Sequence, residues 1–207
     1  MTTKYGFSDV REQLLDSIKS AYPTRWEAGP AQLLGEDIFG SPKPHPNTVL
    51  NLFTEQGIKF ALPFAAYRAG LGGFSSLTSN KPGTALPRLA LASTICGMET
   101  VRGGLAKLAH SVVCNMSLEV CRDGACAVNS IGPTERRMEA LNQIYDAMVK
   151  EGKGDVLSSN LSLSWRRIVC MNCVNKPAKA YHLWRAAIWE ELPRIFGVGK
   201  SWEEVES

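Results

Sequence analysis

Four cysteines carry the most recognisable chemistry in this sequence. Cys121 and Cys126 form a C-x4-C pair, and Cys170 and Cys173 form a C-x2-C pair much later in the chain. Two short pairs that are separated in sequence can assemble one tetrahedral, four-thiolate zinc site. Four thiolates leave no coordination position open for water, which speaks against metal catalysis. We therefore predict that these four residues bind a structural zinc ion.

Two other interpretations of these four cysteines stay open. Free cysteine is among the most buried residue types, so some of the four could be small core side chains. Cys114 or His182 could replace one ligand, because the C-x4-C spacing is loose for a zinc site. Cys96 is expected to lie in the core.

The other residues that could do chemistry form no catalytic pattern. His45, His110 and His182 have no acidic residue at a spacing that predicts a dyad, so we expect surface or helix-face roles for them. The glycine clusters at 70–73 and 152–155 match no phosphate-binding loop and indicate turns. The sequence therefore predicts no catalytic residue and no organic cofactor.

Composition sets limits on the class of protein. The 207 residues are 44% apolar and 21% charged, as in an ordinary globular protein. A net charge of +3 is weak for a nucleic-acid-binding protein, which usually has a concentrated basic surface. The candidates for such a surface are Arg122, Arg136, Arg137, Arg166 and Arg167.

The sequence also bears on the cellular compartment. The N-terminus lacks the apolar run of a secretory signal, and no uncharged apolar stretch approaches the ~18 residues that span a bilayer. We therefore expect no membrane association. We expect the protein to lie in the cytosol or nucleus, where thiols stay reduced, which favours metal binding over disulfides.

The first half of the chain has a helical pattern. Asp9 is predicted to cap a helix that stops at Pro23. The apolar face of this helix consists of Val10, Leu14, Leu15 and Ile18. Prolines and glycines delimit two shorter helices, at 46–57 and 63–70. Residues 26–46 are predicted to be an irregular connection, and residues 71–87 a mobile loop or hinge.

The strongest helix signal lies just beyond residue 87. Its spacing of three and four residues predicts one buried stripe, made of Met98, Val101, Leu105, Leu108 and Val112. Two more helices are predicted, from Pro133 to Gly152 and from Pro177 to Leu192. No long alternating pattern indicates a sheet. We predict an all-α, irregular helical bundle whose C-terminal half is stapled by zinc. It would form a single domain over 1–207, with a potential subdivision into 1–70 and 86–207.

Several segments resemble, in order, the helical region that follows the BTB/POZ domain in proteins of basidiomycete fungi. The segments are YGFSDVR at 5–11 with AYP at 21–23, HPNTVLNL at 45–52, LPFAAY at 62–67, and IWEELPRIFGV at 188–198 with SWEE at 201–204. In that family two cysteine pairs recur, and they correspond to the pairs described above. The BTB core, which carries dimerisation and the cullin contact, is missing here, so those roles do not carry over.

Three functional hypotheses follow. The resemblance implies a non-enzymatic module for protein interaction or scaffolding, with a protein as its partner. The second hypothesis is a small-molecule enzyme whose helices enclose an apolar pocket. The third is a zinc-stabilised nucleic-acid-binding protein, in which the five arginines would have to converge on one face.

Overall fold

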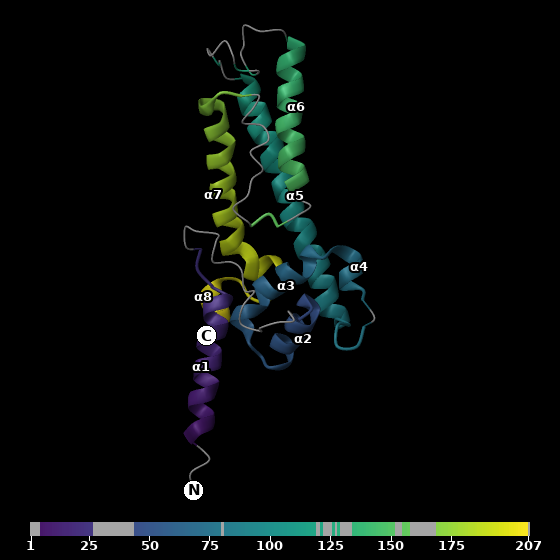
Figure 1. The fold of residues 1–207 in the computed structure, drawn as a ribbon, viewed down its shortest axis with the longest axis vertical. Coiled ribbons are helices and arrows are strands. Elements are labelled where there is room, and N and C mark those ends of the chain that lie inside the picture. Colours follow the sequence, from purple (N-terminus) through teal and green to yellow (C-terminus); the bar gives the residue numbers. More distant parts are fainter. Residues whose placement is uncertain are drawn as a thin grey trace. The chain divides into compact units, whose positions relative to one another are not determined.

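The structure is a computed structural model that describes residues 5–26, 44–79, 81–118, 121, 126, 128, 134–151, 155–157 and 169–206. In these residues all regular secondary structure is helical, which confirms the all-α prediction (Figure 1). The helices are α1 (Tyr5–Ala21), α2 (Pro46–Glu55), the 3-10 turn η2 (Lys59–Ala61), α3 (Leu62–Leu71), α4 (Gly73–Leu77), α5 (Arg88–Leu118), α6 (Thr134–Glu151), α7 (Met171–Ile195) and α8 (Trp202–Glu206).

The chain forms two compact units. Unit 1 consists of Met1–Met98 and Trp189–Ser207, and unit 2 consists of Glu99–Ile188. Both boundaries fall inside helices, so α5 and α7 each contribute residues to both units. The predicted subdivision at residues 71–87 lies within unit 1 instead. None of the helices in the described ranges is long and apolar enough to cross a membrane.

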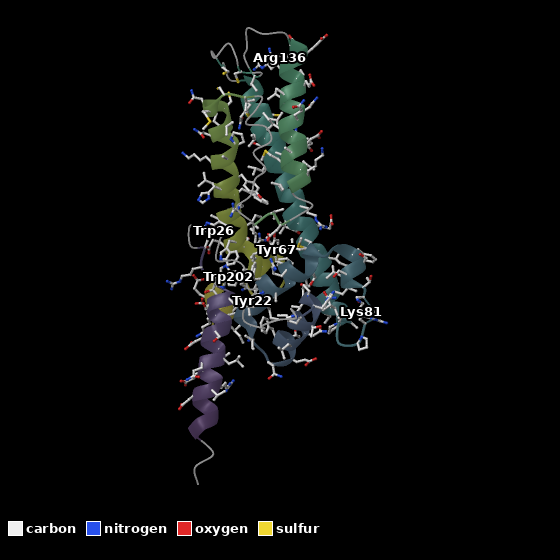
Figure 2. The ribbon with its side chains drawn as sticks, viewed as in Figure 1. Tyr22, Trp26, Tyr67, Lys81, Arg136 and Trp202 are labelled. Carbon is white, nitrogen blue, oxygen red and sulfur yellow. The ribbon has the colours of Figure 1, made fainter. Side chains whose placement is uncertain are left out.

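Aromatic side chains form much of the core of unit 1. Trp189 of α7 is fully buried, and its ring centroid lies 5.4 Å from that of Phe64 and 5.5 Å from that of Trp202. The Trp189 indole N–H donates to the Thr24 carbonyl at 3.2 Å, and the Trp202 indole N–H donates to the Trp189 carbonyl at 2.8 Å. The C-terminal segment therefore belongs to the core of unit 1. The aromatic residues of this unit that Figure 2 labels are Tyr22, Trp26, Tyr67 and Trp202.

Helix α1 differs from its prediction in its start and in its buried face. It begins at Tyr5, so Asp9 lies inside the helix and does not cap it. Ile18 is buried, whereas Val10 and Leu14 are 63% and 57% exposed. The apolar periodicity identified the helix correctly. Burial also requires a surface to pack against, and periodicity carries no information about that surface.

Residues 71–87 contain the short helix α4 and a turn that one buried side chain holds in place. Nδ2 of Asn47, in α2, lies 3.0, 3.4 and 2.9 Å from the carbonyl oxygens of Ser76, Leu77 and Thr84, to which it donates. These bonds tie the described part of the segment to α2. The described part of the segment is thus a short helix and an anchored turn, and it lies within unit 1 and not between two halves of the chain.

Three helices share the core of unit 2. The predicted stripe of α5 is confirmed, since Met98, Val101, Leu105 and Val112 are buried and Leu108 is partly buried. The α5 side chains that face α6 and α7 in this core are Ala109, Val112 and Met116. They meet Ala140, Leu141, Ile144 and Met148 of α6 and Cys173 and Val174 of α7.

Helix α7 is longer than predicted, because two prolines lie inside it. The sequence predicts a start at Pro177 and an interruption at Pro193, yet the helix runs over Met171–Ile195. Each proline lacks a backbone N–H and so removes one helical hydrogen bond. Both prolines are buried, and we infer that their packing offsets this loss. The earlier start places the C-x2-C pair directly at the beginning of the helix.

Candidate metal centre

The four cysteines lie around the beginning of α7. Cys170 directly precedes α7 and Cys173 lies in its first turn, while Cys121 and Cys126 follow the end of α5. The four Sγ atoms all lie within 4.8 Å of one another. The fold thus brings together all four predicted metal ligands.

The spacing of the sulfurs suits four ligands of one ion. Sγ of Cys121 and Sγ of Cys170 are 3.7 Å apart. A tetrahedral zinc ion with Zn–S bonds of about 2.3 Å holds its sulfurs about 3.8 Å apart. A disulfide would bring two sulfurs to about 2.05 Å, and all four thiols are free.

The four cysteines differ in how deeply they are buried. Cys126 and Cys173 are buried and belong to the core of unit 2, whereas Cys121 and Cys170 are partly exposed. The backbone N–H of Cys170 donates to Sγ of Cys126 at 3.3 Å. Such a bond orients a sulfur ligand and favours its thiolate form. The sulfurs are therefore positioned by the core and by the backbone of the turn before α7.

The surroundings shift the pKa values of two of the thiols in opposite directions. The backbone N–H of Cys173 donates to the Cys170 thiol and lowers the pKa of that thiol. Burial, followed by the neighbouring thiols, raises the pKa of Cys173 well above its usual value. A metal cation reverses this penalty, because a coordinated thiol is deprotonated outright. The positive end of the α7 dipole also favours thiolates at this position.

The donor set restricts what could bind. Thiolates select metals that prefer sulfur and do not suit Mg²⁺ or Ca²⁺, which take oxygen ligands. A four-sulfur site also fills a tetrahedral coordination shell. Neither of the alternative ligands, Cys114 and His182, belongs to the group that comes together.

His45 and His110 both have identifiable hydrogen-bond partners. Nδ1 of His45 accepts the backbone N–H of Asn47 at 3.2 Å, and Nε2 lies 3.2 Å from Oγ of Ser76. His45 thus caps α2. Nε2 of His110 lies 3.5 Å from Sγ of Cys114 on the exposed side of α5. The sequence interpretation missed this pair, although a separation of four residues on a helix could have revealed it.

Two other expectations changed. Cys96, predicted to be a core residue, is exposed on α5. Of the five arginines proposed to bind nucleic acid, Arg122, Arg166 and Arg167 lie outside the described residues. Arg136 is exposed near the start of α6, where Figure 2 labels it, and Arg137 beside it is partly buried.

Comparisons of this chain with protein-family models, with curated proteins and with solved structures find no match.

Proposed function

We propose that this chain is a non-enzymatic protein-interaction module in which one structural zinc ion stabilises unit 2. The observation that carries the proposal is the cluster of four cysteine sulfurs, all within 4.8 Å of one another. Zinc is the metal that best suits a tetrahedral all-thiolate set in a structural site. In the cytosol or nucleus the reduced thiols would remain available to it.

A structural role follows from the position of the cluster. The four ligands join the segment after α5 to the first turn of α7, and two of them are core residues. Zinc would therefore fix the end of a three-helix core by linking segments far apart in sequence. With four sulfur ligands the ion would have no open position for a substrate or a water molecule.

Exposed apolar side chains support an interaction role. Met138, near the start of α6, and Met171, the first residue of α7, are 50% and 61% exposed. In Figure 1 both helices begin at the end of unit 2 where α5 finishes, which is also the end that carries the cysteines. Methionines adapt readily to a partner and are frequent at protein-binding surfaces. A protein partner is also what the resemblance to the BTB-protein tail implies.

The experiment compares two exposed positions of unit 2. A photo-crosslinking amino acid replaces Met171 in one variant and Leu183 in the other; Leu183 lies further along α7 and is similarly exposed, at 59%. We expect cross-linking in cells to give one discrete protein adduct from position 171 and little from position 183. Cys173→Ala in the position-171 variant should remove the adduct, because the zinc-dependent end of unit 2 would be lost.

Equal labelling from both positions, or no adduct from position 171, would contradict the interaction proposal. An adduct that persists after Cys173→Ala would instead show that partner binding does not depend on the zinc site.

A further inference from the structure

A second pair of metal-binding side chains lies on α5, apart from the four-cysteine cluster. His110 and Cys114 are four residues apart on this helix, and both are exposed. Nε2 of His110 lies 3.5 Å from Sγ of Cys114. Residues at this separation are neighbours on a helix surface.

This distance is the one that a shared metal ion would require. Zinc binds imidazole nitrogen at about 2.0–2.1 Å and thiolate sulfur at about 2.3 Å. At a tetrahedral angle these bond lengths place the two donor atoms about 3.5 Å apart. The separation of the two donor atoms therefore matches that of two ligands of one ion.

The opposite face of the helix holds the pair in this orientation. Ala109, Val112 and Met116 of the same segment are buried in the core of unit 2. Because packing fixes the rotation of α5, His110 and Cys114 remain directed to solvent. Little rearrangement of the backbone would be needed when a metal binds.

We propose that His110 and Cys114 form a second metal site, for a divalent transition-metal ion such as Zn²⁺. Imidazole nitrogen and thiolate sulfur together suit this class of ion. Unlike the four-cysteine cluster, this site supplies two ligands and leaves the other coordination positions to water or to a donor from another molecule. It binds metal more weakly than the cluster and fills only after the cluster does.

Cobalt titration of the full-length chain tests the proposal. The protein is first supplied with one equivalent of zinc per chain, which is enough for the four-cysteine cluster alone, and its zinc content is measured. Co²⁺ is then added while the sulfur-to-cobalt charge-transfer absorption is recorded. We expect one further saturable step of about one Co²⁺ per chain. Zinc content and the cobalt step are separate readouts, so a failure of the four-cysteine site is distinguished from a failure of this one.

Three variants assign the step to its ligands. Cys114→Ser should abolish the absorption, and His110→Ala should weaken cobalt binding by about tenfold or more, since even loss of an outer-shell partner costs 10–100-fold. Cys96→Ser removes another exposed cysteine of α5 and should change neither. All three positions are on the surface, so the thermal unfolding of each variant should match that of the wild-type protein. The proposal is overturned if the wild-type protein shows no additional step, or if the step persists in the His110→Ala, Cys114→Ser double variant.

Discussion

At the scale of single residues, the sequence revealed the role of the four cysteines but not that of Asn47. The cysteine pairs were recognisable because short spacings are themselves the signature of a metal site. Asn47 was not, because its partners are carbonyls 29, 30 and 37 residues away that only the folded chain brings close. Roles that depend on contacts between distant backbone groups leave no local pattern.

Asn47→Ala is therefore expected to be costly. The substitution leaves the carbonyls of Ser76, Leu77 and Thr84 without this donor, and each buried polar group that loses its partner costs about 1–3 kcal/mol. Asn51→Ala is the matched control one turn further along α2, because the bond from Asn51 to the Ala85 carbonyl is exposed. Urea denaturation should show a clearly larger loss of unfolding free energy for Asn47→Ala. Equal losses would mean that Asn47 does not anchor the turn.

At the scale of elements, sequence identified most helices but misplaced several ends. The ends depend on packing that periodicity cannot report, as the buried prolines inside α7 show. The glycines of α5 make the same point. A Cβ on Gly97 would lie 2.5 Å from the Phe196 ring, whereas a Cβ on Gly103 would meet nothing within 4 Å. The two glycines are indistinguishable in the sequence, yet only Gly97 is required by packing.

Alanine at these two positions should have opposite effects. Gly97→Ala forces the Phe196 ring to move and is expected to cost about 1–3 kcal/mol, as overpacking usually does. Gly103→Ala should raise the free energy of unfolding by up to about 1 kcal/mol, because alanine is the better helix former. Thermal or chemical unfolding of both variants checks the signs. A stabilising Gly97→Ala would show that α5 and Phe196 are not in close contact.

At the scale of the whole molecule, the chain has two cores with different sources of stability. Unit 1 relies on buried aromatic rings around Trp189, and unit 2 on a three-helix core beside the cysteine cluster. The sequence predicted the cysteine cluster and the buried stripe of α5. It did not show that residues before Met98 and after Trp189 belong to one unit, because that association is between opposite ends of the chain.

The two cores should respond to different perturbations. Trp189→Ala is expected to cost about 3–5 kcal/mol and to increase hydrogen exchange first in α2, α3 and α8. A zinc chelator should increase exchange first around residues 169–174 and in the last turns of α5. Hydrogen exchange measured by mass spectrometry resolves these segments. If the chelator raises exchange in α2 and α3 as strongly as around residue 170, metal binding is not confined to unit 2.

Metal content tests the central claim most directly. Full-length protein purified without a chelator should contain about one zinc per chain by elemental mass spectrometry. In the same measurement Cys173→Ala should lose most of this zinc, and Cys96→Ala should keep it. Wild-type protein that carries no metal even after refolding with zinc would contradict the account. So would about one zinc per chain in a variant in which Cys121, Cys126, Cys170 and Cys173 are replaced together with Cys114 of the proposed second site.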